Sequence, residues 1–244
     1  MKFSTAGAVA ALLILAGCGD QGGNASTGAP AIEKIPAPNN GDWTEMVSET
    51  PEGGFRMGNP EAPVKLVEYG SLSCSHCAEF AEQASGILRE DYVKTGRVSW
   101  EFRPVMLFPS DPGVTMLLRC QGPSPFFQLS DQLYADQANW LGALQTAAPA
   151  AQAQLSAMTP HQRAGAMVRM AGLDAFFRGR GMPQSKIDSC LADPQALESQ
   201  VSQSERVAAQ DGVQGTPTFL INGTLVPNAA SWAALEPALR AAVR

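Results

Sequence analysis

The feature that most constrains this chain is a pair of cysteines, Cys74 and Cys77, separated by Ser75 and His76. An apolar, strand-like run ends just before the pair, and a helix-like run begins directly after it. This order places Cys74 at the exposed N-terminus of a helix, where free backbone N–H groups and the helix dipole favour an anion. Cysteines in such positions have pKa values of roughly 3.5–7.5, so we expect Cys74 to be the nucleophile and Cys77 the resolving thiol.

Other uses of this motif fit the sequence less well. A structural zinc site needs four ligands, and the remaining candidates, Cys120, Cys190 and His161, are isolated in the sequence. A c-type haem motif needs a histidine directly after the second cysteine, where this chain has Ala78. An inert disulfide is an alternative, although so short a loop stabilises a fold little. We therefore predict a redox-active dithiol with no metal and no organic cofactor.

His76 lies inside the motif and could donate a hydrogen bond or a positive charge to the Cys74 thiolate. Such a contact would stabilise the reduced protein and make the oxidised protein a stronger oxidant. The alternative is an ordinary exposed histidine at the start of a helix.

The N-terminal residues 1–17 are typical of a secretory signal, with Lys2 followed by an apolar stretch and small residues. The four residues that end at Cys18 resemble the bacterial lipobox, in which the cysteine becomes lipidated after cleavage. An ordinary cleaved signal is the alternative. Residues 18–42 are mostly small and polar, so we predict a flexible tether between a lipid anchor and a folded domain.

The number of cysteines is consistent with an exported protein. Five cysteines less the lipidated Cys18 leave four, an even number in a compartment that permits disulfides. Close spacing pairs Cys74 with Cys77 and leaves Cys120 with Cys190. A bridge that closes this loop of roughly 70 residues would stabilise the fold by about 4 kcal/mol. A second redox relay and two free thiols are the alternatives for this pair.

Charge and length limit the class of protein. The formal net charge is −6 and no basic patch alternates with aromatic residues, so nucleic acid is not an expected partner. The part after the signal is long enough for one core with an inserted subdomain, and we expect a monomer.

The pattern of apolar residues divides the domain into three parts. Residues 43–112 indicate an edge hairpin and then a strand, a helix and a strand, which predicts a parallel βαβ unit. Residues 113–212 carry only helix signals, including a capping box at Thr159 and a helix start at Asp193. Residues 213–244 indicate a tight hairpin and a final helix.

The dithiol, the helical insertion and the segment 213–219 together resemble the DsbA-like thiol–disulfide oxidoreductases of the bacterial periplasm. The resemblance implies an α/β, thioredoxin-like fold with an all-helical insertion between a βαβ half and a C-terminal ββα half. It also implies that Pro217 is a cis-proline facing the dithiol. The backbone of Thr216 would then be free to pair with an extended substrate, with Gly215 and Ser75 on the same substrate-binding surface.

The resemblance gives two further expectations. Glu68 corresponds to a buried acid beneath the active site that assists proton transfer to or from Cys77; an exposed glutamate on an edge strand is the alternative. The pair Cys120 and Cys190 is similar to the extra disulfide that some members carry in the helical domain. Ser75 and Thr216 depart from residues common in strongly oxidising members, which leaves the strength of the oxidant open.

These observations favour a lipid-anchored periplasmic enzyme, on the inner or outer membrane, that introduces disulfide bonds into reduced exported polypeptides. A DsbB-like, quinone-linked membrane protein would reoxidise it. One alternative is a disulfide isomerase or reductase of the same fold, kept reduced by a membrane donor. Another is a non-enzymatic lipoprotein that binds a metal or a client through the dithiol.

Overall fold

The computed structural model describes Lys2 and residues 33–244. At its centre lies a six-stranded sheet with the strand order β1-β2-β4-β3-β5-β6. β3 and β4 run parallel and the other neighbouring strands run antiparallel, which confirms the predicted βαβ unit and edge hairpin. The strands are β1 (Val47–Glu49), β2 (Phe55–Gly58), β3 (Val64–Gly70), β4 (Val98–Pro104), β5 (Thr218–Ile221) and β6 (Thr224–Leu225).

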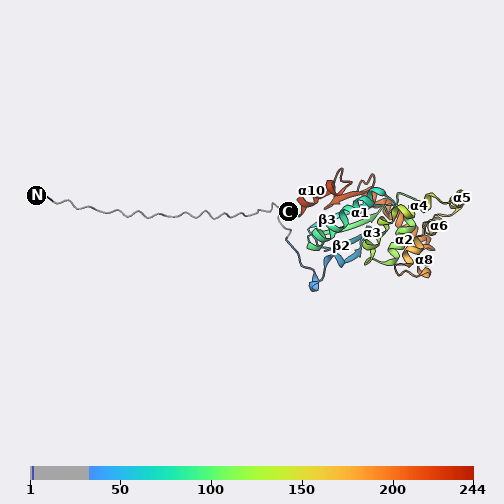
Figure 1. The fold of residues 1–244 in the computed structure, drawn as a ribbon, viewed down its shortest axis with the longest axis horizontal. Helices are drawn as coiled ribbons and strands as arrows, with labels where there is room; N and C mark the ends of the chain where they lie inside the picture. Colours follow the sequence, from blue (N-terminus) through green and yellow to red (C-terminus); the bar gives the residue numbers. More distant parts are fainter. Residues whose placement is uncertain (1, 3–32) are drawn as a thin grey trace. The chain divides into compact units, whose positions relative to one another are not determined.

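Helices cover the sheet and extend beyond one end of it (Figure 1). None of the helices in the described part is long and apolar enough to cross a membrane. The α-helices are α1 (Ser75–Ile87), α2 (Asp111–Gln121), α3 (Phe126–Ala135), α4 (Gln137–Gln145), α5 (Pro149–Ala157), α6 (Pro160–Met170), α7 (Leu173–Arg178), α8 (Gln184–Leu191), α9 (Pro194–Gln210) and α10 (Trp232–Val243).

One face of the sheet packs against α1, α3 and α10, and aromatic side chains form the contacts of α1 and α3. The ring of Phe80 on α1 lies 4.5 Å from that of Phe219 on β5. On α3, Phe126 stacks on Phe55 of β2 with ring centroids 3.8 Å apart. Burying a side chain of this size contributes about 1.5–3 kcal/mol, so these contacts hold α1 and α3 firmly on the sheet.

The opposite face of the sheet packs against the C-terminal part of α9. Val67 and Tyr69 of β3 point to this face and are buried together with Val207 of α9 and Leu220 of β5. Alternation along β3 therefore directs Leu66 and Glu68 to the α1 face. Both faces of this central strand are buried, as is usual for a parallel strand covered by helices.

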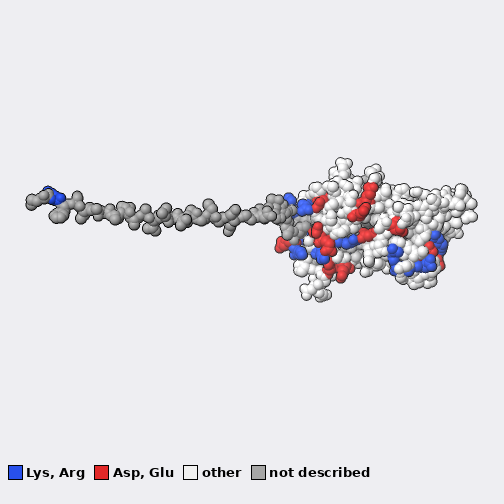
Figure 2. Space-filling view, viewed as in Figure 1, with Lys and Arg blue, Asp and Glu red and all other residues white. Residues whose placement is uncertain are grey.

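The helical insertion runs from α2 to α9 and gathers at one end of the sheet (Figure 1). Its helix starts follow the sequence signals: the backbone N–H of Thr159 donates to Gln162, and Asp193 accepts two N–H groups of α9. Residues 137–160 contain no Lys, Arg, Asp or Glu, and the end of the molecule that carries α4 and α5 is correspondingly white in Figure 2.

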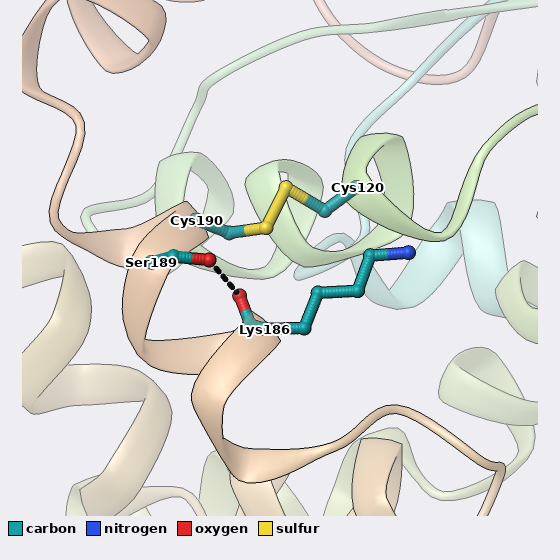
Figure 3. Close-up of a disulfide and its surroundings, with 4 residues drawn as sticks. All are labelled: Cys120, Lys186, Ser189 and Cys190. Atoms are coloured by element: carbon teal, nitrogen blue, oxygen red, sulfur yellow. Dashed lines mark hydrogen bonds between the residues drawn. A yellow bond between two sulfur atoms is a disulfide. The ribbon is translucent and has the colours of Figure 1, made fainter.

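A disulfide between Cys120 and Cys190 joins the C-terminal turn of α2 to that of α8, with Cα atoms 6.4 Å apart (Figure 3). Ser189, beside Cys190, donates its hydroxyl to the carbonyl of Lys186 within α8. The bridge thus ties two helices of the insertion to each other.

Two further predictions concern the ends of the domain. Ser231 precedes α10 as expected, but its side chain makes no capping hydrogen bond. The signal sequence 1–17 and Cys18 lie outside the described residues, apart from Lys2. The part of the predicted tether that the structure describes is hydrogen-bonded to the domain. The N–H of Ile35 donates to the carbonyl of Thr95, and the carbonyl of Ile35 accepts the indole N–H of Trp43.

Candidate active site

Cys74 occupies the N-cap position of α1, at the point where the chain leaves β3. The backbone N–H groups of His76 and Cys77 point at its sulfur from the first turn of the helix. The residue is only 8% exposed, so the expected position at the helix start is correct but the expected exposure is not. The neighbouring loop at Pro217 covers part of the sulfur, as described below.

The two cysteines are free thiols with opposite acidities. A hydrogen bond from the Cys77 thiol, followed by contacts from Thr216 and the two backbone N–H groups, lowers the pKa of Cys74 to about 5 despite its burial. Cys77 is fully buried, and its pKa is raised because it donates to Cys74, is desolvated and lies near two acidic groups, Cys74 and Glu68, that disfavour a further negative charge when they ionise. Near neutral pH the pair therefore holds one thiolate and one thiol.

The loop before β5 closes over Cys74. The peptide bond between Thr216 and Pro217 is cis, as the resemblance implies, and the carbonyl of Thr216 accepts the Cys74 thiol at 3.4 Å. The hydroxyl of Thr216 is buried and has no hydrogen-bond partner among the described residues. The carbonyl of Gly215 accepts the hydroxyl of Thr218 at 2.7 Å, which fixes the loop onto the strand.

His76 does not make the side-chain contact that the sequence predicts. Its ring is exposed and lies 3.3 Å from the carboxylate of Glu79, three residues further along α1. Residues three apart on a helix lie on the same face, and His76 meets Glu79 on the exposed face of α1. His76 contributes to Cys74 through its backbone N–H instead.

Glu68 is buried on the α1 face of β3, with 1% of its surface exposed, so it is not an exposed residue of an edge strand. It accepts the indole N–H of Trp100 on the neighbouring strand β4 at 3.0 Å. Burial raises the pKa of this carboxyl to about 8, opposed by the Trp100 hydrogen bond and assisted by the negative charge of Asp131. Glu68 is therefore largely protonated near neutral pH and lies close enough to influence the pKa of Cys77.

The sequence did not identify the groups of the helical insertion that hold the loop before Cys74. Asp111 of α2 accepts the backbone N–H of Ser73 at 3.1 Å. Gln137 of α4 donates to the carbonyl of Cys74 at 3.0 Å, and Tyr134 of α3 donates to that of Ser71 at 3.2 Å. An Asp-Pro pair at residues 111–112 was the one available signal, and by itself it marks only a helix start.

Other candidate chemistry lies outside this site. The sulfurs of Cys120 and Cys190 are bonded to each other within the insertion and not to the dithiol. Within residues 33–244, no group of three or more His, Cys, Asp or Glu side chains is arranged to hold a metal ion.

Comparisons with known proteins agree with this geometry. The family described as Thioredoxin matches residues 50–241. The crystal structure of a protein-disulfide isomerase from Novosphingobium aromaticivorans is 30% identical, with a TM-score of 0.74, over 79% of this chain and 98% of that one. Wolbachia pipientis alpha-DsbA1 shares the fold, with a TM-score of 0.61 at 18% identity over 86% of this chain and 93% of that one.

A Rickettsia bellii (strain RML369-C) protein, provisionally named a protein-disulfide oxidoreductase, is 22% identical over 178 residues. The matched region is 72% of this chain and 60% of the relative, so the chain spans less than two thirds of that protein's length. The match to the Thioredoxin family covers the sheet, the dithiol and the insertion alike. The chain therefore belongs to the thioredoxin family, in which its helical insertion places it with the DsbA-like proteins.

Proposed function

We propose that this protein is a thiol–disulfide oxidoreductase that oxidises reduced polypeptides through a reversible disulfide between Cys74 and Cys77. The observation that carries the proposal is the position of the Cys74 sulfur at the start of α1, 3.4 Å from the carbonyl of Thr216 and with its pKa lowered to about 5. A thiolate of this acidity stabilises the reduced protein and so makes the disulfide form a strong oxidant.

The reaction is two successive thiol–disulfide exchanges. A substrate thiolate attacks the sulfur of Cys74 in the oxidised protein, a mixed disulfide forms, and the Cys74–Cys77 bond breaks with Cys77 as the leaving group. A second substrate thiolate then attacks the substrate sulfur of the mixed disulfide, and Cys74 leaves as a thiolate. Two electrons pass from the substrate dithiol to the protein, and the low pKa of Cys74 makes it a good leaving group.

Glu68 supplies the proton that the first exchange requires. Cys77 leaves as a thiolate in a buried position where the thiol is strongly favoured. A neighbouring carboxyl with a pKa of about 8 carries a proton at neutral pH and can release it to that sulfur. The same carboxylate would accept the proton back when the dithiol is reoxidised.

The substrate-binding surface in this proposal comprises Gly215, Thr216 and Pro217, with Ser75 at the start of α1. Thr216 precedes β5 and is not part of the ladder between β5 and β3, which begins at Thr218. Its backbone can therefore pair with an extended segment of substrate, as in other cases where a peptide adds to the edge of a sheet. The substrates would be reduced polypeptides delivered by export.

The proposed location is the bacterial periplasm, where a lipid on Cys18 would anchor the protein to the inner or outer membrane. A DsbB-like, quinone-linked membrane protein would take the electrons from the reduced dithiol. The enzyme would work as a monomer with the dithiol as its redox centre and with no metal or organic cofactor. The lipobox-like residues before Cys18 and the even number of remaining cysteines support this location.

Disulfide isomerisation is the second candidate, because the Novosphingobium structure at 30% identity is named a protein-disulfide isomerase. An isomerase works from the reduced dithiol, and a membrane electron donor would then replace the reoxidase. The acidity of Cys74 favours the oxidase. Equilibration with glutathione separates the two: a potential near −120 mV, as in DsbA, supports oxidation, and one near −270 mV, as in thioredoxin, supports reduction or isomerisation.

The decisive experiment is a single turnover of the oxidised protein with a reduced two-cysteine peptide, with the disulfide in the peptide and the thiols in the protein measured by mass spectrometry. We expect one peptide disulfide per protein and none with Cys74→Ser. The Cys120→Ser/Cys190→Ser protein is the matched control and should still oxidise the peptide. Oxidation by Cys74→Ser would refute the proposal, and stoichiometric copper binding without peptide oxidation would favour a metal-binding role.

A further inference from the structure

The four-residue loop between β3 and α1, Ser71–Cys74, is held by a carboxylate from the helical insertion. Asp111, the first residue of α2, is 1% exposed and accepts three hydrogen bonds. Its Oδ1 accepts the backbone N–H of Ser73 at 3.1 Å. Its Oδ2 accepts the hydroxyl of Ser71 and the backbone N–H of Phe108, both at 2.9 Å.

Burying a carboxylate at this position is costly. Desolvation raises the pKa of Asp111, and the three hydrogen bonds act against that rise. A burial of this kind is tolerated where the hydrogen bonds are made in full, because a buried charge without partners costs several kcal/mol. Asp111 does not cap its own helix, because its three donors all lie outside α2, whereas the exposed Asp193 accepts two N–H groups of α9.

Two of the residues that Asp111 holds, Ser71 and Ser73, lie in the loop directly before Cys74. The N–H of Cys74 donates to the carbonyl of Ser71 at 3.1 Å, and the carbonyl of Cys74 accepts the N–H of Ala78 at 3.1 Å. Ser73 directly precedes Cys74, and its hydroxyl also bonds to that of Ser110, at 2.7 Å. Fixing Ser71 and Ser73 therefore fixes the direction in which Cys74 enters α1.

We propose that Asp111 is a positioning residue for the redox-active pair: it locks the loop before Cys74 so that the sulfur stays over the first N–H groups of α1. This inference rests on the proposed function, because it assigns the helical insertion a part in the reactivity of that dithiol. Asp111 touches neither sulfur in the hydrogen-bond pattern and acts through Ser71 and Ser73.

The direction in which Asp111→Asn shifts the pKa of Cys74 distinguishes a positioning role of Asp111 from an electrostatic role and from a role in folding alone. The negative charge of Asp111 by itself disfavours a nearby thiolate, so a purely electrostatic role predicts that Asp111→Asn lowers the pKa of Cys74. A positioning role predicts the opposite, because a loosened loop moves the sulfur away from its N–H donors. A role in folding alone predicts lower stability and an unchanged Cys74.

The test is Asp111→Asn in the full chain, with the rate of iodoacetamide alkylation of the reduced protein measured from pH 3 to 9. The Asn side chain keeps one acceptor oxygen, so either Ser73 or Phe108 loses its partner. We expect the pKa of Cys74 to rise by about one unit, which slows alkylation at pH 5 roughly fivefold. The glutathione equilibrium should shift about tenfold toward the disulfide form, a potential roughly 30 mV lower.

Asp193→Asn is the matched control, since it also changes the aspartate of an Asp-Pro helix start. It should leave the alkylation profile unchanged. If Asp111→Asn does not fold, Ser71→Ala removes one donor and keeps the carboxylate, and a smaller shift in the same direction is expected. An unchanged or lowered pKa of Cys74 in the folded variant overturns the inference. That result would leave the proposed function intact. The proposed function itself fails only if the Cys74→Ser protein still oxidises the peptide.

Discussion

The carboxylate of Glu68 and the indole of Trp100 are joined by a buried hydrogen bond of 3.0 Å across the two parallel strands at the centre of the sheet. Trp100 is in turn covered by the guanidinium of Arg89, 5.8 Å from the ring centroid, and Arg89 pairs with Asp131 of α3. Glu68 is thus held in one orientation beneath α1 and shielded from water. This position is the one that the proposed proton transfer between Glu68 and Cys77 requires.

Glu68→Gln should remove a pH dependence from the stability of the oxidised protein. The pKa of Glu68 is raised in the folded protein to about 8. The stabilisation of the fold by this group is therefore complete at pH values below the pKa of Glu68 in the unfolded chain, and it is lost as the pH rises through 8. The wild-type free energy of unfolding should fall with pH between about 5 and 8, by at most about 1.4 kcal/mol per unit from this group. Urea unfolding of both oxidised proteins across this range gives the difference.

Glu82→Gln is a suitable control, because Glu82 is an exposed carboxylate on α1. Its stability curve should run parallel to that of the wild type. If the Glu68→Gln curve is also parallel, Glu68 is not the protonated acid described above.

Cys74 should make the reduced protein more stable than the oxidised one at neutral pH. The pKa of Cys74 is lowered in the folded state. The stabilisation of the fold by the thiolate is therefore complete above the pKa of a cysteine in the unfolded chain, about 8.5, and it is lost as the pH falls through about 5. At pH 7 we expect an advantage of roughly 2 kcal/mol, somewhat less than the full pKa shift would give because part of the effect is screened. Cys77 adds nothing here, because it is a thiol in both states at this pH.

Urea unfolding of the two redox forms at pH 7 and pH 4 measures this advantage. The Cys74→Ser protein should be less stable than the reduced wild type at pH 7, where the thiolate stabilises the fold, and equally stable at pH 4, where Cys74 is a thiol. An oxidised form that is the more stable of the two at pH 7 would contradict the assigned acidity of Cys74.

Local signals in the sequence were enough to predict the frame of the fold and the position of the dithiol. The strand before Cys74, the helix after it and the hairpin at Asn222 and Gly223 each depend on neighbouring residues, and each is present in the structure. The cis bond at Pro217 came from the resemblance, since no local pattern distinguishes a cis from a trans proline.

The supports of the site could not be predicted in the same way. Asp111 and Gln137 meet the loop before Cys74 from 38 and 63 residues away, and only the packing of the insertion brings them there. His76 was misjudged for the opposite reason. It is two residues from Cys74 in sequence, but its ring lies beside Glu79 on the exposed face of α1.

Removing the disulfide of the insertion should lower stability and spare the dithiol. The bridge closes a loop of 70 residues, so the Cys120→Ala/Cys190→Ala protein should lose about 4 kcal/mol. For a domain of this size the loss corresponds to a fall in Tm of roughly 8–16 °C. Calorimetry measures the Tm, and the glutathione equilibrium of Cys74 and Cys77 should move less than twofold. A larger shift of that equilibrium would mean that α2 transmits the state of the bridge to the active site.

Thr216→Val should weaken the thiolate without weakening the fold. The Thr216 hydroxyl is buried and has no partner in the described part of the chain, while the Cys74 thiol donates to the Thr216 carbonyl. When Cys74 ionises, its sulfur becomes an acceptor, and a hydrogen bond from the Thr216 side chain is one of the contacts that lower its pKa. Valine keeps the shape and removes this donor, so the pKa of Cys74 should rise, and alkylation at pH 5 should slow about twofold for a rise of half a unit.

The stability of the reduced Thr216→Val protein should be equal to that of the wild type at pH 4, or higher by up to about 1 kcal/mol, because an unsatisfied buried hydroxyl has been removed. Thr224→Val, an exposed change on β6, is the control for the substitution itself and should alter neither property. A variant that loses stability at pH 4 and keeps the wild-type alkylation profile would show that the hydroxyl serves the loop and not the sulfur. Lower acidity with unchanged stability would instead make Thr216 a direct determinant of the oxidising strength of the pair.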